Sequence, residues 1–202
     1  DSGATAIVIL ENFAATLQQV LERVPLKLVV VTAMGDLQPF WKGALVNHMV
    51  RRVKELVPPW DLPGCFAFKQ ALSEGKRMSL ASVDLKPSDL AVLQYTGGTT
   101  GVSKGAMLLH STIIANLLTS EAWMQPGLRR KPITGQLPIV CALPLYHVFA
   151  FITCGLLGMR AGARNLLIAN PRDLPQTIKT LKPHRLHIFP GVNTLFNGLL
   201  NQ

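Results

Sequence analysis

Charge, cysteine and aromatic residues are all scarce in this sequence, and each scarcity excludes a class of protein. Only 15% of the residues are charged and 49% are hydrophobic, which excludes a disordered chain. The three cysteines, Cys65, Cys141 and Cys154, form no CxxC pair and are too few for a disulfide framework. Aromatic residues make up 6% and are not interleaved with the basic runs, so no nucleic acid partner is indicated. The composition predicts a folded protein of a reducing, cytoplasmic compartment.

Residues 132–159 contain no Asp, Glu, Lys or Arg, a length that raises the question of a membrane span. Pro138, Pro144 and Tyr146-His147 interrupt the apolar pattern, so a buried strand and a buried helix are expected instead. At the N-terminus, Asp1–Ala4 is not a basic segment followed by an apolar core, and no signal peptide is expected.

Apolar runs alternate with helical patterns along the chain. Residues 6–10 and 28–31 flank a helical pattern and predict a strand–helix–strand unit. An amphipathic helix is expected over 41–57, followed by an irregular stretch over 58–88 that is a candidate sub-boundary. The expected apolar side of this helix consists of Val46, Met49, Val50, Val53, Leu56 and Val57. The later strands are expected over 90–95, 139–143, 164–169 and 185–189, and the later helices over 112–124, 149–159, 174–181 and 192–200. This order predicts an α/β fold: a mostly parallel sheet with helices on both faces, and ligands at the carboxyl ends of its strands.

A stretch rich in Gly and Thr carries the clearest chemical signal. Its four glycines allow positive φ and close backbone approach to a ligand, and successive N–H groups in such a loop attract anions. Four hydroxyl groups and one lysine add donors and positive charge. The Walker spacing is absent, because Ser precedes the Lys and Gly follows it. A polyphosphate-binding loop between two extended segments is predicted, with a glycine-rich surface turn as the alternative. The residues are Tyr95, Thr96, Gly97, Gly98, Thr99, Thr100, Gly101, Val102, Ser103, Lys104, Gly105 and Ala106.

Residues 93–104 resemble the phosphate-loop signature of the AMP-forming acyl-CoA synthetases, within the adenylate-forming enzyme superfamily. Other segments resemble the bacterial long-chain fatty-acid–CoA ligases in particular: residues 1–4, 34–36, 144–150, 170–173 and 191–197. The resemblance covers the whole chain and implies that residues 1–202 are a central part of the large AMP-binding domain. The family's later motifs come after this region, so the remainder of the enzyme chain is an implied partner and the piece alone is expected to be inactive.

The resemblance also implies a reaction. With ATP and Mg²⁺, such enzymes activate a fatty acid as an acyl-adenylate and release pyrophosphate, and coenzyme A then displaces AMP. Residues 96–105 would wrap the β- and γ-phosphates, within the nucleotide-binding stretch 95–106. Thr99 or Thr100 would lie near the metal, and Lys104 would have a catalytic role in the release of pyrophosphate.

The segment Tyr146–Phe149 resembles the second core motif of the same family. The resemblance places His147 as a catalytic residue at the mouth of the acyl site, and Phe151 at about the position of an aromatic gate to the fatty-acid tunnel. Taken alone, a histidine between aromatic residues is more often a satisfied core residue, and Phe149 and Phe151 are equally explained as core. The implied substrate-binding residues are Tyr146, His147, Phe149, Phe151, Gly191, Val192 and Asn193.

Several alternatives remain open from the residues themselves. The basic runs Arg51–Lys54 and Arg129–Lys131 are typical of a solvated face, and they would also suit an anionic membrane surface, with the protein peripheral at the inner membrane. A non-catalytic module that binds nucleotide phosphate or lipid is the second function class. The pair His184 and His187 has a metal-like spacing, but no Cys or carboxylate is near it in the sequence.

Overall fold

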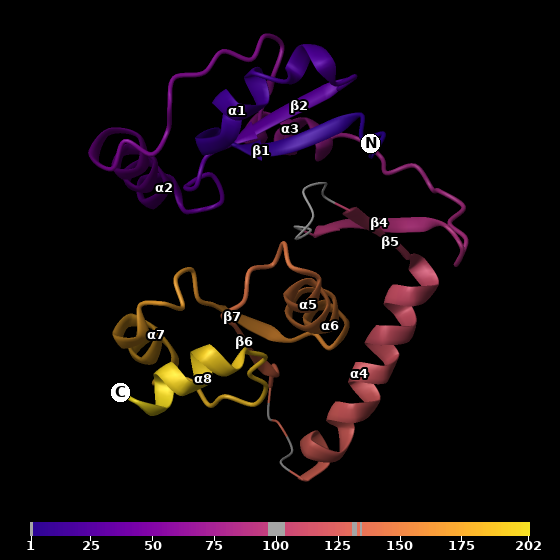
Figure 1. The fold of residues 1–202 in the computed structure, drawn as a ribbon, viewed down its shortest axis with the longest axis vertical. Coiled ribbons are helices and arrows are strands. Elements are labelled where there is room, and N and C mark those ends of the chain that lie inside the picture. Colours follow the sequence, from indigo (N-terminus) through magenta and orange to yellow (C-terminus); the bar gives the residue numbers. More distant parts are fainter. Residues whose placement is uncertain (1, 97–103, 131–132, 134) are drawn as a thin grey trace. The chain divides into compact units, whose positions relative to one another are not determined.

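The computed structural model describes residues 2–96, 104–130, 133 and 135–202. The chain divides into two compact units, residues 1–83 and residues 84–202, and each is described by itself (Figure 1). The division falls within the turn-rich stretch 58–88. Three of the four strand pairings are parallel, but the described strands form three small sheets and not one.

The first unit is built on the expected strand–helix–strand unit. β1 (Ala6–Leu10) and β2 (Leu28–Thr32) pair in parallel, with Ala6 opposite Leu28. The connection holds a 3₁₀ turn η1 (Glu11–Phe13), α1 (Ala14–Gln18) and a second 3₁₀ turn η2 (Leu21–Arg23). β3 (Phe66–Ala67) adds a short parallel strand beside β2. Ala14, Leu17, Val31 and Leu62 form the buried centre of this unit.

The helix predicted over 41–57 is shorter, and its predicted apolar side is only partly packed: Val50 is buried, whereas Met49, Val53 and Leu56 are exposed. α2 (Phe40–His48) continues as a π-helical segment η3 (Met49–Val53) and ends there. The packed side contains Gly43 and Val50, whereas Val53 is 59% exposed. Gly43 decides this orientation, because a Cβ on it would collide with the backbone carbonyl of Gly35. α3 (Phe68–Gly75) follows, where a short helix was expected.

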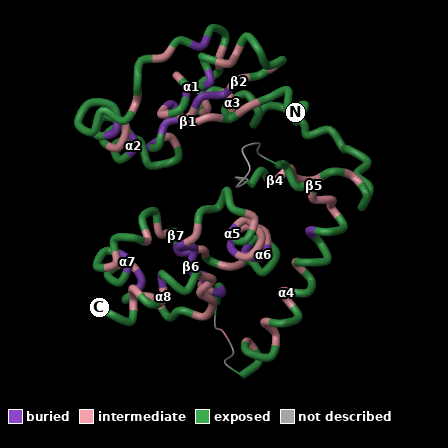
Figure 2. Tube along the Cα trace, in the orientation of Figure 1, coloured by how far each residue is buried: buried purple, intermediate pink, exposed green. Residues whose placement is uncertain are grey.

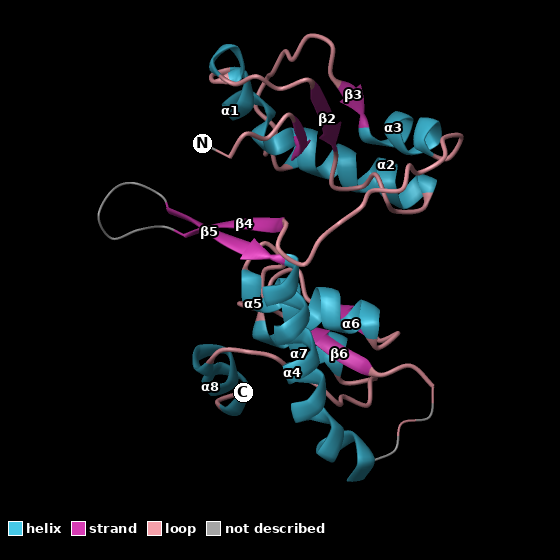
Figure 3. Ribbon diagram, turned by 90° about the vertical axis from the view of Figure 1, so that its right-hand side faces the viewer, coloured by secondary structure: helices cyan, strands magenta, loops and turns pink. Residues whose placement is uncertain are grey.

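The second unit begins with an antiparallel hairpin (Figure 3). β4 (Leu90–Thr96) pairs with β5 (Lys104–Leu109), and α4 (His110–Arg130) follows directly. The predicted start of this helix at Ser111 or Thr112 and its end at Met124 were both too narrow. α4 begins at His110 and continues through Pro126 to Arg130, although a proline in a helix interior removes one N–H donor.

β6 (Pro138–Cys141) and β7 (Arg164–Leu167) form the parallel pair at the centre of this unit. The chain between them contains α5 (Val148–Ala150), a π-helical segment η4 (Phe151–Leu156) and α6 (Leu157–Arg160). Residues 132–159 are thus not one long helix, and no helix of the described ranges is long and apolar enough to cross a bilayer.

Helices cover both faces of this pair of strands, as predicted. On one face, Val140 packs with Leu166, and with Leu181 and Leu195 from α7 (Leu174–Leu181) and α8 (Asn193–Leu200). On the other face, Ile139 and Cys141 pack with Cys154 of η4. Because successive residues of a strand point to opposite faces, β6 is buried on both sides (Figure 2).

The strand predicted over 185–189 is not formed. Only an isolated parallel bridge joins Ile139 to Ile188, where Val140 N–H donates to the Ile188 carbonyl at 2.9 Å. Pro138, the first residue of β6, provides a reason, because proline has no N–H to donate and the ladder cannot continue from Ile188 towards Leu186.

Candidate functional site

The β4–β5 hairpin holds the two ends of the predicted phosphate-binding loop. Tyr95 lies opposite Gly105 and Thr96 opposite Lys104 in the ladder, and Ala106 pairs with Gln94. Thr96 Oγ1 lies 3.5 Å from the Lys104 carbonyl oxygen, and Lys104 is exposed. The loop residues themselves fall outside the described ranges: Gly97, Gly98, Thr99, Thr100, Gly101, Val102 and Ser103. The structure therefore fixes where this loop begins and ends.

Gly105 is required by the packing of Tyr95. A Cβ built on Gly105 would lie 3.2 Å from Cζ of the Tyr95 ring, which covers the glycine across the hairpin. An aromatic side chain that covers a cross-strand glycine supports the ladder at a position where glycine alone is weak. Tyr95 thus has a local structural role at the mouth of the loop.

His147 sits in the turn that joins β6 to α5. Its Nδ1 accepts a hydrogen bond from the Phe149 N–H at 3.3 Å and so caps α5. This bond requires Nδ1 to be unprotonated, so the neutral ring carries its proton on Nε2 and can donate from there. Both His147 and Tyr146 are exposed, the latter by 84%, so His147 is not the satisfied core histidine of the alternative interpretation.

Phe149 lines two apolar cavities, one of about 350 Å³ and one of about 370 Å³. The first is lined from β5 and α4 by Leu108 and Ile113, and the second by Trp123 of α4 and Phe189. Thr153 of η4 also lines both. Phe151, the first residue of η4, is half-buried and lines neither of the two cavities.

The π-helical turn explains why Thr153 was missed. A sequence pattern read at the α-helical period misplaces side chains after an extra residue enters the turn. Thr153 Oγ1 donates to the Phe149 carbonyl at 2.7 Å, which leaves its methyl group for the cavities.

A third cavity of about 550 Å³ lies at the carboxyl ends of β6 and β7. Leu143 and Pro144 follow β6, Arg172 follows β7, and Val192 precedes α8. This is the edge where α/β sheets bind ligands. Val192 was predicted as a substrate-binding residue, whereas Arg172 was not, although it lies in the loop that follows β7, five residues after the end of that strand.

Gly191 and Asn193 flank Val192 at the start of α8, and Asn193 is exposed. A Cβ on Gly191 would lie 2.7 Å from Cζ of Phe196, whose ring packs edge-on against Phe189 with centroids 5.3 Å apart. Gly191 therefore leaves room for the Phe196 ring to pack against Phe189.

Two features determine the electrostatics around these cavities: the burial of the Cys141 thiol and the small number of acidic side chains. Burial and the adjacent Cys154 raise the pKa of the Cys141 thiol to about 11, which keeps it neutral beneath the strand edge. Among the described residues, no three His, Cys, Asp or Glu side chains converge as a metal site. The predicted metal residues Thr99 and Thr100 lie outside those ranges.

Comparison with known proteins shows the class to which this fold belongs. A red-emitting luciferase from Phrixothrix hirtus aligns with 92% of this chain and 31% of its own, at a TM-score of 0.60 and 17% identity. The N-terminal domain of FACL13 from Mycobacterium tuberculosis aligns with 98% of this chain and 46% of its own, at 0.55 and 18%. The fold is that of the adenylate-forming enzyme domains, as predicted.

The AMP-binding enzyme family model matches residues 1–202, and the chain belongs to that family. A long-chain-fatty-acid–CoA ligase from Escherichia coli O157:H7 is 49% identical over 201 residues, which is 100% of this chain and 35% of the ligase. The predicted resemblance to bacterial ligases of this kind is confirmed. The chain spans about a third of the length of the curated relatives that it matches.

Proposed function

We propose that this chain is the central part of an AMP-forming long-chain fatty-acid–CoA ligase. The carboxylate oxygen of the fatty acid attacks the α-phosphorus of ATP, pyrophosphate leaves, and the coenzyme A thiolate then displaces AMP from the acyl carbon. The observation that carries this proposal is the 49% identity along the whole chain to a ligase of that name.

The ATP polyphosphate is proposed to bind at the loop between β4 and β5. Support comes from the hairpin, which sets Thr96 and Lys104 opposite each other at the loop's two ends. Exposed Lys104 supplies a mobile positive charge for the leaving pyrophosphate. Mg²⁺, which neutralises developing phosphate charge in such reactions, is proposed at Thr99 or Thr100.

The acyl chain is proposed to lie in the apolar cavities on either side of Phe149. Both are lined mainly by apolar side chains, as a hydrocarbon ligand requires. His147, two residues before Phe149, would face the carboxylate or adenylate with its Nε2. Tyr146, Phe151, Gly191 and Asn193 remain proposed substrate-site residues around this core, and Val192 lines the cavity at the strand ends.

An anionic membrane surface is proposed as a further partner of a cytoplasmic protein that is peripheral at the inner membrane. The supporting observation is α2, where Phe40 is 87% and Trp41 65% exposed, with Lys42 Nζ 5.1 Å from the centroid of the Trp41 ring. Exposed aromatic residues beside cations favour the headgroup region of a bilayer. The fraction of protein that sediments with anionic vesicles should fall after Trp41→Ser. It should stay unchanged after Trp123→Ser, which changes another exposed tryptophan and serves as the control.

Turnover of palmitate, ATP and coenzyme A by the full-length protein tests the main proposal. Lys104→Ala should lower the rate of pyrophosphate release, while Lys86→Ala, an exposed lysine ahead of β4, should leave it unchanged. Phe149→Trp should shift the preference towards shorter acids by filling the cavities.

A non-catalytic module that binds nucleotide or lipid predicts a different result. It would bind ATP with an affinity that depends on Lys104, yet the full-length protein would form neither acyl-AMP nor acyl-CoA. Residues 1–202 alone are expected to show negligible turnover, and full activity of that piece would contradict the assignment as part of a larger enzyme.

A further inference from the structure

The helical segment beside the two apolar cavities contains a π-helical turn. This turn, η4, lies between α5 and α6, and its residue Thr153 lines both cavities together with Phe149. π-Helical turns are rare and occur frequently at functional sites. Because such a turn departs from the regular α-helical ladder of hydrogen bonds, the contacts that hold η4 in place also determine the shape of the cavities.

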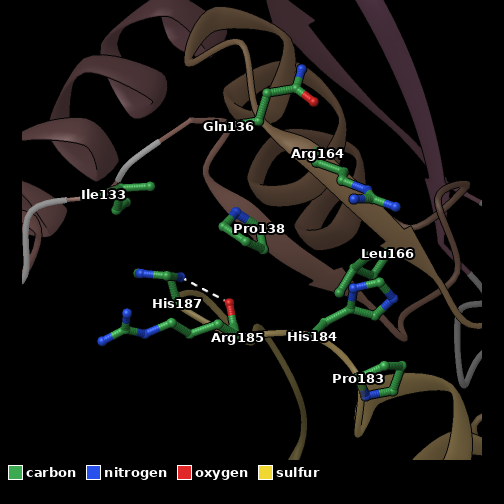
Figure 4. A pocket seen from close by; sticks show the side chains of 9 residues that line it. All are labelled: Ile133, Gln136, Pro138, Arg164, Leu166, Pro183, His184, Arg185 and His187. Carbon is green, nitrogen blue, oxygen red and sulfur yellow. Dashed lines mark hydrogen bonds between the residues drawn. The ribbon is translucent and has the colours of Figure 1, made fainter.

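A side chain of β7 is bonded to the backbone of this turn. The Nδ2 of Asn165 donates to the Cys154 carbonyl oxygen at 2.8 Å, and Asn165 pairs with Ile139 in the β6–β7 ladder. Its two neighbours, Arg164 and Leu166, line a cavity of about 440 Å³ (Figure 4). Because successive residues of a strand point to opposite faces, Asn165 is directed to the other face of the strand, where η4 packs.

Gly158 of α6 leaves the space that this amide occupies. A Cβ built on Gly158 would lie 2.8 Å from Nδ2 of Asn165, so any other residue here would displace the amide. Gly158 is buried, and it lies four residues after Cys154, about one helical turn along the segment. Glycine is a poor helix former, and the space needed by Asn165 explains its presence at this position.

The bond from Asn165 ends one residue from a side chain that lines the cavities. Cys154, whose carbonyl accepts this bond, is fully buried and packs against Ile139 of β6. Thr153 precedes Cys154, and its Oγ1 donates to the Phe149 carbonyl at 2.7 Å. A shift of the Cys154 backbone would therefore move Thr153 and its bond to Phe149, and both residues line the two cavities.

The remaining polar atom of Asn165 shows that this amide is not an efficient way to fill the space. Its Oδ1 is buried and has no hydrogen-bond partner within the described ranges. A buried polar atom without a partner costs free energy, which a leucine of similar volume would avoid. The amide is therefore explained by what its donor does, which is to hold the Cys154 carbonyl.

We propose that Asn165 is a positioning residue of the acyl site, and that its bond to Cys154 sets the length of acyl chain that the cavities accept. The inference rests on the proposed function, because it extends the assignment of the acyl chain to the cavities beside Phe149. Asn165 lines neither of these cavities, so it acts through η4 and not by contact with the substrate.

Turnover of palmitate and of decanoate by the full-length protein, with ATP and coenzyme A, tests this role. Asn165→Leu removes the donor at similar volume and loosens the wall that contains Thr153. The ratio of kcat/KM between the two acids should fall by about tenfold, since one methylene in a well-formed apolar pocket is worth about that much. The change should lie in KM, with kcat within about twofold of the parent, because Asn165 does not contact the reacting groups.

Asn12 provides a matched control in the other unit. Its Nδ2 donates to the Leu56 carbonyl at 2.9 Å, and within the described ranges its Oδ1 is likewise buried without a partner. Asn12→Leu should leave the ratio between the acids within about twofold of the parent. An equal change in both variants would overturn the proposal, because it would reflect a general loss of stability. An unchanged ratio in Asn165→Leu, with thermal unfolding like that of the parent, would also overturn it.

A pair of glycine variants tests the same bond without changing Asn165. Gly158→Ala displaces the amide and should lower the ratio between the acids as Asn165→Leu does. Gly155→Ala, in η4, is the control and should keep the ratio, because its Cβ would meet Leu145 and Phe151 at an ordinary 3.9 Å. Equal ratios in the two glycine variants would contradict the role of the Asn165 amide.

The proposed function and this inference fail in different ways. A parent protein that activates no fatty acid would contradict both, whereas an active parent whose preference survives Asn165→Leu would contradict the inference alone. Hydrogen exchange followed by mass spectrometry reads the bond independently of activity: Asn165→Leu should speed exchange over 151–160, and Asn12→Leu should not. Unchanged exchange over 151–160 after Asn165→Leu would show that this bond does not hold η4.

Discussion

The two units of this chain use charge in different ways. Residues 1–83 contain nine Lys or Arg and seven Asp or Glu, a net charge of +2, whereas residues 84–202 contain eleven and four, a net charge of +7. In the first unit, buried Glu11 holds Arg51 with three hydrogen bonds, and Asp36 accepts from Thr32 and Ala33. In the second, most basic side chains have no acid to pair with.

Charged side chains thus serve internal stabilisation in the first unit, whereas in the second unit they remain available to ligands. In the first unit, Glu11 and Asp36 form hydrogen bonds that hold the unit's own loops in place. Hydrogen bonding to Glu11 raises the pKa of the Arg51 guanidinium. The second unit relies on apolar packing around β6, and among the residues that the structure describes, Lys104, Arg164 and Arg185 form no ion pair with an acid. Cations without internal partners are those available to bind phosphate.

The largest effect is expected from the apolar core of the second unit. Ile139 is fully buried in β6, so Ile139→Ala should cost about 2–5 kcal/mol through lost burial and a residual cavity. Hydrogen exchange followed by mass spectrometry should show faster exchange in 84–202. Equal acceleration in 1–83 would mean that the two units unfold together, which would break the comparison.

Alkaline pH should also weaken the second unit selectively. The pKa of the Cys141 thiol is raised from an ordinary 9.0 to about 11 in the folded state, so folding favours the protonated form. The stabilisation is complete below pH 9.0 and is lost as the pH rises through about 11, by up to about 3 kcal/mol.

Urea denaturation at several pH values checks the sign. Cys141→Ala should flatten the alkaline loss of stability, whereas Cys65→Ala, in the first unit, should leave it as it is. A flat profile in the parent chain would contradict the role of burial at Cys141.

The Glu11–Arg51 pair should be the main electrostatic contribution within the first unit. Glu11 is 3% exposed, so Glu11→Gln removes charged hydrogen bonds at a buried position and should cost about 1.5–3 kcal/mol. The measurement is hydrogen exchange in 1–83, with 84–202 as the internal reference. A loss confined to 84–202 would refute the assignment of this pair to the first unit's stability.

The smallest effect is expected from the ion pair of the second unit. Glu121 and Arg160 lie 2.8 Å apart, against 2.7 Å for Glu11 and Arg51, but the Glu121 side chain is 34% exposed whereas that of Glu11 is 5% exposed. Glu121→Gln should therefore cost less than about 1 kcal/mol in urea denaturation. A cost equal to that of Glu11→Gln would show that burial does not distinguish the two pairs.

Much of the fold could be predicted because local patterns were strong. The strand–helix–strand start, the helices α7 and α8, and the extended segments on both sides of the Gly/Thr-rich loop follow from apolar period and from turn residues. Asp173, a residue type that favours helix N-termini, caps α7, and its Oδ1 accepts from the Gln176 N–H at 3.1 Å.

The predictions that failed depended on contacts that a local pattern does not show. Met49 and Val53 fit the same apolar side as Val50, yet the helix packs through Gly43 and Val50 and leaves both of them exposed. Residues 185–189 have the composition of a strand, but Pro138 has no N–H to extend the pairing and only a bridge at Ile188 is formed.

The sequence by itself determined the order of the elements and the family, because these depend on neighbouring residues and on their types. Tertiary structure decided which side chains share a cavity: Phe149 and Thr153 line both apolar cavities, and Arg172 joins Val192 at the strand ends. These cavities are lined by residues that are distant in the chain, because the packing of helices and strands, and no local pattern, brings such residues together.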